Sequence, residues 1–303
     1  MTETKPSRFD VVIVGAGAAG LTAAVMLGRS KQRILVVSLP RRRNSSALAV
    51  RNVPYADGLP PDEIYAKMEL DAAGAGVEFC WDEVTSVQAG DDEVTVATRG
   101  NGTFVAARLL LATGRRDEIP HWLPDGVWGR TVFECPYCHT FENSGKTFAV
   151  VGRTDNTTWL ARLAQVHAGR MTVLVGDPQV LQQPDRARDL LVADGAEVFA
   201  DEVTSAVVGP AGELRLATKA GREVVVDVVL LAEVAQPDQR FTGMLGLDLM
   251  DNGHPRIDTY GRTSHPRVYS AGNALGSPHY MWTGAASSGL NAAKSIWEDV
   301  MTK

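Results

Sequence analysis

The chain has 303 residues, of which 45% are hydrophobic and 22% charged, and its formal net charge is −6. This length suggests about two domains of ~150 residues each, and the acidity argues against nucleic acid and anionic membrane surfaces as partners. The longest apolar runs, such as 224–234, fall short of the ~18 residues that span a bilayer. The polar first ten residues show no signal peptide, and three cysteines suit the reducing cytosol. We therefore expect a cytoplasmic protein without membrane or nucleic-acid partners.

A glycine-rich turn stands between two predicted strands near the start of the chain. Residues 9–14 are a β-branched apolar run, residues 21–27 are good helix formers, and residues 33–37 are a second apolar run. Together they predict a βαβ unit of about 30 residues. In such a unit, glycines let the backbone approach a pyrophosphate at the helix N-terminus. We expect a dinucleotide-binding turn at Gly15, Gly17 and Gly20; the alternative is a tight turn that binds nothing.

The position after the second predicted strand usually carries an acidic residue that binds a ribose, and here it is Ser38. A serine still bonds a hydroxyl group, although more weakly than a carboxylate does. Arg41, Arg42 and Arg43 follow, and an arginine here could contact an adenylate phosphate. The alternative for the three arginines is a solvated loop.

The middle of the chain predicts a hairpin and then a second nucleotide-binding frame. Alternating segments at 94–98 and 104–111 predict hairpin strands, the second of which leads into the sequence LLLATG at 109–114. After a linker at 115–129, a strand at 147–151, a helix at 158–167 and a strand at 171–175 form another βαβ frame.

The turn of this second frame, residues 152–157, keeps only the first of the three glycines, Gly152. The side chain of Thr154 therefore crowds the place where a pyrophosphate would come close. No basic cluster follows residue 175, where a 2′-phosphate would need arginines. The frame of a nucleotide domain is present, while its binding chemistry is eroded.

Cys135 and Cys138 lie in the sequence Cys-Pro-Tyr-Cys-His, a spacing at which two thiols can form a disulfide. A helix N-terminus or a neighbouring base can then lower the pKa of one thiol. The alternatives are haem c attachment, a zinc site and a glutaredoxin motif. Haem c attachment would need an export signal, and a structural zinc site would need a second cysteine pair. In glutaredoxins the motif opens a small domain, whereas here it lies in the middle of the chain. We expect a redox-active pair and no metal, with His139 either moving protons or only packing, and with Cys80 as a buried thiol.

A third motif, residues 268–273, is an apolar strand that ends in Gly272 and Asn273, followed by a helix of small residues at 284–293. If this motif and the N-terminal turn hold one cofactor, the second βαβ frame must be inserted between two halves of the first domain. His279 lies near this motif and is an alternative to His139 as a base.

With these motifs in order, the chain resembles the low-molecular-weight thioredoxin reductase superfamily over essentially its whole length. The motifs are GAGAAG at 15–20, ATG at 112–114, CPYC at 135–138 and SAGN at 270–273. The resemblance implies an α/β fold with two Rossmann-like, ββα-inserted nucleotide-binding domains, the second inserted into the first. It implies a homodimer, an FAD-binding domain at 1–116 and 245–303, and an NADPH-type domain at 117–244 that carries the cysteine pair. It places FAD at Gly15, Gly17, Ala18, Gly20, Ser38, Arg43, Asn44, Thr113, Gly114, Gly272 and Asn273.

More narrowly, residues 128–130 and 133–139, together with Arg43-Asn44, resemble the branch that contains the dithiol oxidases of gliotoxin, holomycin and romidepsin biosynthesis. That resemblance to enzymes of antibiotic biosynthesis implies oxidation of a small-molecule dithiol, with electrons passing from FAD to O2 and H2O2 as a product. It implies that Cys138 lies nearest the flavin and that His139 moves protons.

The chain departs from the family pattern at Ser38, at Asn273, which replaces an acidic residue, and at 280–281, which replace Arg-Gln. Two other functions stay open from the sequence. One is a disulfide reductase fed by NADPH or ferredoxin, and the other is a flavin-binding protein without turnover. The sequence does not identify the dithiol substrate.

Overall fold

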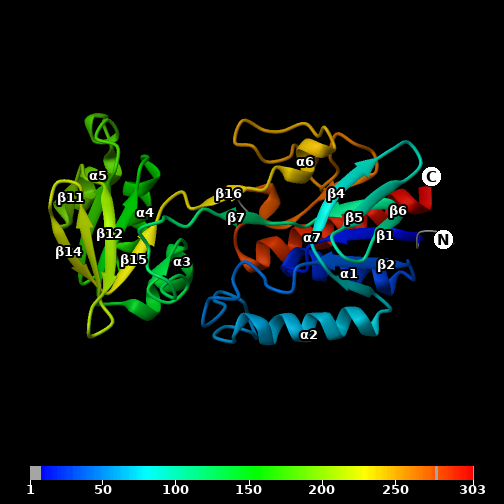
Figure 1. Cartoon of the computed structure of the whole chain (residues 1–303), viewed down its shortest axis with the longest axis horizontal. Coiled ribbons are helices and arrows are strands. Elements are labelled where there is room, and N and C mark those ends of the chain that lie inside the picture. Colours follow the sequence, from blue (N-terminus) through cyan, green and yellow to red (C-terminus); the bar gives the residue numbers. More distant parts are fainter. Residues whose placement is uncertain (1–7, 277–278, 303) are drawn as a thin grey trace. The chain divides into compact units, whose positions relative to one another are not determined.

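The computed structural model describes residues 8–276 and 279–302, and the chain divides into two compact units (Figure 1). The first unit comprises Met1–Ser45, Asn52–Arg116 and Pro237–Lys303, and the inserted unit comprises Ser46–Arg51 and Asp117–Gln236. Each unit has its own sheet and its own core. The structure confirms the expected α/β class with two Rossmann-like folds.

The first unit is built on a sheet whose parallel strands alternate with helices in the chain. In chain order its N-terminal elements are β1 (Arg8–Val14), α1 (Ala18–Arg29), β2 (Ile34–Ser38), α2 (Pro61–Gly74) and β3 (Glu78–Trp81). The β-branched residues of β1 and β2 are buried on both faces of the sheet, as expected for parallel strands covered by other elements. Sequence analysis predicts this βαβ unit correctly.

An antiparallel meander and a last parallel strand complete the same sheet. The meander consists of β4 (Val84–Ala89), β5 (Val94–Thr98) and β6 (Thr103–Leu111), and β17 (Val268–Ser270) pairs with β6 in parallel. The sheet order is β3-β2-β1-β6-β5-β4. Helix α7 (Trp282–Thr302) starts earlier and ends later than the 284–293 expected from sequence, and it packs against α1.

The inserted unit repeats this plan with a five-stranded parallel sheet and a three-stranded antiparallel one. The parallel sheet has the order β11-β10-β9-β15-β8 and the antiparallel sheet the order β12-β13-β14. The strands are β8 (Val132–Phe133), β9 (Thr147–Gly152), β10 (Arg170–Val175), β11 (Glu197–Phe199), β12 (Val203–Val208), β13 (Leu214–Thr218), β14 (Glu223–Val226) and β15 (Val228–Leu231). The helical segments are α3 (Pro136–His139), η1 (Phe141–Asn143), α4 (Asn156–Ala164), η2 (Val180–Gln182) and α5 (Arg186–Ala193).

Two short strands, β7 (Arg115–Asp117) and β16 (Ala235–Pro237), pair where the chain passes between the units. The chain enters the inserted unit after Arg116 and returns to the first unit at Pro237. The return position has a packing cause. Helix α6 (Arg240–Met244) buries Phe241 among the core residues on one face of the first sheet, so 237–244 fold with the first unit.

The two units share a sequence repeat that sequence analysis misses. Asp-Glu-Val-Thr-Ser occurs at 82–86 and again at 201–205. Asp82 accepts hydrogen bonds from the backbone N–H groups of Gly100 (2.8 Å) and Asn101 (2.9 Å), and Asp201 accepts one from the N–H of Ala220 (3.1 Å). In both units the aspartate of the repeat therefore holds, by hydrogen bonds, the turn between the second and third strands of an antiparallel meander.

Within the described residues, no helix is long and apolar enough to cross a membrane. The described part of the chain also holds no cluster of three or more His, Cys, Asp or Glu residues with the geometry of a metal site.

Candidate active site

The carboxyl ends of three neighbouring strands bring the three predicted dinucleotide motifs of the first unit together. Val14 at the end of β1 pairs with Leu111 at the end of β6, and Leu111 pairs with Ser270 at the end of β17. The turn at Gly15, the ATG motif and the SAGN motif therefore begin side by side at one sheet edge. In parallel α/β sheets this is the edge at which ligands bind.

The glycines of this edge fall into two classes. Gly15 has a φ of +110°, and a Cβ atom there would overlap the carbonyl oxygen of Ala112; a Cβ on Gly20 would overlap the carbonyl oxygen of Gly15. These two glycines let segments of the chain pack. Gly17 and Gly114 have no described heavy atom within 4 Å of a Cβ position, so their faces are open.

The open faces of Gly17 and Gly114 fit a bound dinucleotide. Gly17 is the N-cap of α1 and forms no side-chain cap hydrogen bond, so the first-turn N–H groups of this 12-residue helix are without a side-chain cap. Backbone N–H donors at a helix N-terminus beside open glycine faces are what a pyrophosphate requires. The structure brings Gly15, Gly17, Ala18, Gly20, Thr113 and Gly114 to one sheet edge, and that they bind the pyrophosphate of FAD stays a prediction.

The end of β2 is organised around Arg42, which the sequence does not separate from Arg41 and Arg43. The Arg42 Nε donates to the carbonyl of Ala16 (3.3 Å), and its guanidinium forms an ion pair with Glu69. It also lies 5.0 Å from the ring centroid of Tyr65. Only 14% of the Arg42 side chain is exposed, so the solvated-loop alternative is wrong for this arginine. Arg42 joins the glycine turn to the loop that follows β2 and to helix α2.

The other residues predicted at this end lie in the same loop. The Ser38 hydroxyl donates to the carbonyl of Leu39 (3.0 Å), and Asn44 accepts a hydrogen bond from the Tyr65 hydroxyl (2.9 Å) through its side-chain oxygen. Burial raises the pKa of Tyr65, so its hydroxyl remains a donor. Arg43 lies half-buried in the same loop. What Ser38, Arg43 and Asn44 bind stays a prediction.

The SAGN motif is held by helix α7. The Gly272 N–H donates to the Ser288 hydroxyl (2.8 Å), and a Cβ on Gly272, whose φ is +77°, would lie 2.8 Å from the Cβ of Ala19. Asn273 is half-buried beside this contact. Tyr280, in place of the expected arginine, lies 4.1 Å from the guanidinium of Arg115, measured from the ring centroid. The departure at 280 therefore creates a new stacked pair next to the ATG motif.

In the inserted unit, Cys135 and Cys138 form a disulfide at the start of α3. Cys135 is the N-cap residue, and Pro136 fits the first helical position because it needs no N–H partner there. Both cysteines are half-buried, which leaves the disulfide accessible. Cys80, half-buried on β3 of the first unit, is the free cysteine, and burial raises the pKa of its thiol.

His139 directly follows the pair and is held against the protein. Its ring stacks on Phe133 with a centroid distance of 4.1 Å and an interplanar angle of 19°. Burial lowers the pKa of His139 to about 4, with Arg51 acting in the same direction and Glu142 and Glu134 opposing it. The imidazole is therefore neutral near pH 7, and burial makes it a weak base. His279 belongs to the first unit and is half-buried.

The turn after β9, where NADPH would bind in a thioredoxin reductase, is filled by a side chain of the same unit. One Glu233 carboxylate oxygen accepts the backbone N–H of Arg153 (3.0 Å), and the other accepts the hydroxyl hydrogen of Thr154. The Arg153 guanidinium is engaged by Glu202 (2.5 Å). The eroded motif thus corresponds to a turn in which the Arg153 N–H and the Thr154 hydroxyl are already bound by Glu233.

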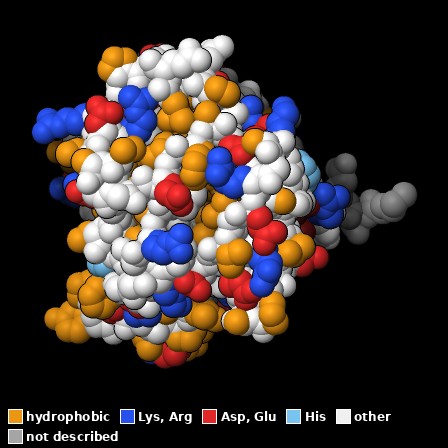
Figure 2. Space-filling view, turned by 90° about the vertical axis from the view of Figure 1, so that its left-hand side faces the viewer, with side chains coloured by type: hydrophobic (Ala, Val, Ile, Leu, Met, Phe, Trp, Pro, Cys, Tyr) orange, Lys and Arg blue, Asp and Glu red, His pale blue; other side chains and the backbone are white. Residues whose placement is uncertain are grey.

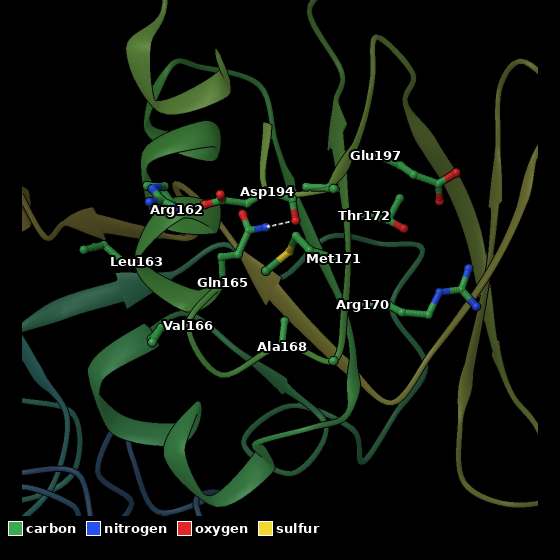
Figure 3. A pocket seen from close by; sticks show the side chains of 13 residues that line it. Arg162, Leu163, Gln165, Val166, Ala168, Arg170, Met171, Thr172, Asp194 and Glu197 are labelled. Atoms are coloured by element: carbon green, nitrogen blue, oxygen red, sulfur yellow. Dashed lines mark hydrogen bonds and ion pairs between the residues drawn. The ribbon is translucent and has the colours of Figure 1, made fainter. Parts of the chain in front are cut away.

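A cavity of the inserted unit lies at the opposite sheet edge (Figure 3). Its lining includes Arg170 and Thr172 at the start of β10, whereas Gly152 pairs with Val175 at the end of that strand. Gln165 reaches across it to the carbonyl of Asp194 (3.3 Å). The lining has neither cysteine nor histidine, and the unit's face in Figure 2 mixes acidic, basic and apolar side chains. The cavity is not a nucleotide site of the usual kind.

Residues 9–289 match the family described as pyridine nucleotide-disulphide oxidoreductase. The chain belongs to this family. It is a thioredoxin reductase-like, FAD-dependent disulfide oxidoreductase, as the sequence motifs predict.

Several relatives match nearly the whole chain. Thioredoxin reductase sirT of Leptosphaeria maculans is 28% identical over 97% of this chain and 94% of its own length. The thioredoxin reductase of Streptomyces clavuligerus is 28% identical over 94% and 91%. The crystal structure of HlmI has a TM-score of 0.87 at 28% identity and covers 97% of this chain and 92% of its own. Thioredoxin reductase from Streptococcus pyogenes, with a TM-score of 0.89 at 20% identity over 99% and 100%, shows the fold alone.

Two residues of these sites escape sequence analysis. Arg42 stands in a run of three arginines, and the sequence has no signal that selects it. Glu233 does have a signal, because Leu-Leu-Ala recurs at 110–112 and 230–232 and aligns the ATG motif with residues 232–234. In that alignment Glu233 stands at the position equivalent to Thr113.

Proposed function

We propose that this flavoprotein is a dithiol oxidase: it forms a disulfide in a small-molecule dithiol and passes the electrons to O2, which leaves as H2O2. The observation that carries the proposal is the pairing of an accessible Cys135–Cys138 disulfide with a nucleotide turn closed by Glu233. A reductase of the NADPH type needs that turn open. The resemblance of residues 128–139 to dithiol oxidases supports the same direction.

The cysteine pair carries out the exchange. One substrate thiolate attacks Cys135, breaks the disulfide and forms a mixed disulfide, and Cys138 leaves as a thiolate. The second substrate thiolate then attacks the substrate sulfur of that mixed disulfide and releases Cys135. The substrate has lost two electrons and two protons, and the enzyme has gained two electrons as a reduced cysteine pair.

We propose that His139 takes part in the proton transfers of this exchange. Thiol–disulfide exchange needs a thiolate, and the neutral imidazole of His139 lies next to Cys138 in sequence. We infer that it relays a proton from a substrate thiol to solvent, in a transient step because burial disfavours the protonated ring. The stacking on Phe133 fixes the ring plane, so the base is held in place before substrate binds.

FAD, bound at the glycine edge of the first unit, supplies a two-electron acceptor that can be reoxidised by O2. The chain's role toward FAD is to hold the pyrophosphate at Gly15–Gly20 and 113–114 and the remainder at Ser38, Arg43, Asn44, Gly272 and Asn273. We further propose that the enzyme works as a homodimer in the cytoplasm, where its substrate dithiol is kept reduced.

An oxygen-electrode experiment tests the proposed function with dithiothreitol as the probe dithiol. The wild-type flavoprotein should consume O2 and release one H2O2 for each dithiothreitol oxidised. Cys138→Ser should retain FAD but lose this activity, whereas Cys80→Ser, which replaces a cysteine outside the pair, should retain both. Equal activity in wild type and Cys138→Ser would contradict the assigned role of the pair.

A further inference from the structure

The two units of this chain can be compared strand by strand at their nucleotide edges. In the first unit the Ala112 N–H donates to the carbonyl of Val14 (2.9 Å), and in the inserted unit the Ala232 N–H donates to the carbonyl of Val151 (2.9 Å). These matching hydrogen bonds superpose the two edges in register. Residues 113 and 233, which come next, therefore stand at equivalent positions, as do Gly17 and Thr154 two residues after each first glycine.

The equivalent positions are open in one unit and closed in the other. Around Gly17 the first unit has free space, whereas in the inserted unit Thr154 carries a hydroxyl that donates to Glu233. The second Glu233 oxygen accepts the Arg153 N–H. Glu233 has a φ of +62°, a conformation that a residue other than glycine keeps only where its surroundings hold it.

We propose that the Glu233 carboxylate occupies the pyrophosphate position of the inserted unit and thereby excludes nicotinamide dinucleotides from it. This inference rests on the proposed oxidase function and assigns its choice of electron donor to one residue. A carboxylate is an anion with two acceptor oxygens, and here it binds two donors of the turn, the Arg153 N–H and the Thr154 hydroxyl. It also repels the charge of an approaching pyrophosphate.

The neighbouring arginine does not offset this repulsion. The Arg153 guanidinium lies 2.5 Å from Glu202, so the Glu202 and Glu233 carboxylates both contact Arg153 of the turn. Glu202 binds only the side chain of Arg153 in these contacts, whereas Glu233 binds its backbone N–H. Glu202 is therefore a matched control: its removal deletes the same charge without vacating the backbone donor.

The test measures binding by the whole flavoprotein, with inorganic pyrophosphate and NADPH as separate ligands in calorimetric titrations. Glu233→Thr/Thr154→Gly reproduces the open turn of the first unit, and Glu202→Thr/Thr154→Gly is its control. We expect the first variant to bind both ligands at least about tenfold more tightly than wild type and the control. Equal binding by the two variants would overturn the inference.

A second variant covers the case in which the double substitution does not fold, as judged by flavin content and circular dichroism. Glu233→Gln removes the charge and keeps an acceptor, and it should bind pyrophosphate more tightly than Glu202→Gln; equal binding would overturn the inference. The proposed function has its own readout, the oxidation of dithiothreitol by the wild type. Its failure is therefore distinguishable from a failure of the Glu233 variants to gain nucleotide binding.

Discussion

Two alanine substitutions in one turn should separate packing from cofactor binding. Gly15→Ala places a methyl group against the carbonyl oxygen of Ala112 and puts alanine at a φ of +110°. The unfavourable φ and the forced displacement together should lower the free energy of unfolding of the apoprotein by about 2–4 kcal/mol. Gly17→Ala meets no described atom within 4 Å and has an ordinary φ of −81°. Its cost to the apoprotein is the poorer N-cap, about 0.5–1 kcal/mol.

Gly15→Ala should cost more stability than Gly17→Ala, whereas Gly17→Ala should cost more FAD affinity than Gly15→Ala. The open face of Gly17 is where the backbone would approach the pyrophosphate, so a methyl group there should weaken FAD binding about tenfold or more, or ~1.4 kcal/mol. The assay uses urea unfolding of the FAD-free protein and fluorescence titration with FAD for each variant. Gly74→Ala, at another glycine with open space around it, is a control for alanine itself.

Either of two results would contradict these expectations. If Gly17→Ala binds FAD as tightly as wild type does, the pyrophosphate does not lie beside Gly17. If Gly15→Ala leaves the apoprotein as stable as Gly17→Ala does, the overlap with Ala112 is not a real constraint on the turn.

Two further predictions concern ionisable groups. Because burial lowers the folded-state pKa of His139 to about 4, the unfolded chain binds the extra proton first, and stability should fall by up to about 3 kcal/mol as the pH drops from 6.5 to 4. His139→Phe should flatten this part of the pH–stability curve, and an unchanged slope would exclude His139 as its source. Hydrogen bonds led by that from the Gly100 N–H hold the pKa of Asp82 well below its usual range. Asp82→Ala should therefore lower the melting temperature at pH 7, while the exposed Asp92→Ala should not; equal effects would refute the fastening role of Asp82.

Much of the fold follows from short-range sequence signals. The glycine turn at 15–20 lies between an apolar run and a helix-forming run, and the local pattern suffices to predict β1, α1 and β2. The Cys135–Cys138 pair is predictable because a separation of three residues already restricts its geometry. The discontinuous first unit follows from motifs that must share a cofactor.

Other features depend on contacts between distant residues and have no local signal. The boundary at Pro237 is set by the burial of Phe241 among core residues from strands far away in the chain, such as β5 and β6. Arg42 differs from Arg41 and Arg43 because it forms an ion pair with Glu69, which is 27 residues away in the chain. The closure of the inserted turn depends on the register between β9 and β15, which brings Glu233 to Arg153 across 80 residues.

The most direct measurement of the central claim is an anaerobic titration of the purified flavoprotein, followed through its visible flavin absorbance. Dithiothreitol alone should bleach the flavin, NADPH should leave it unchanged, and admission of air should restore the colour with release of H2O2. Rapid bleaching by NADPH, or no bleaching by the dithiol, would contradict the account.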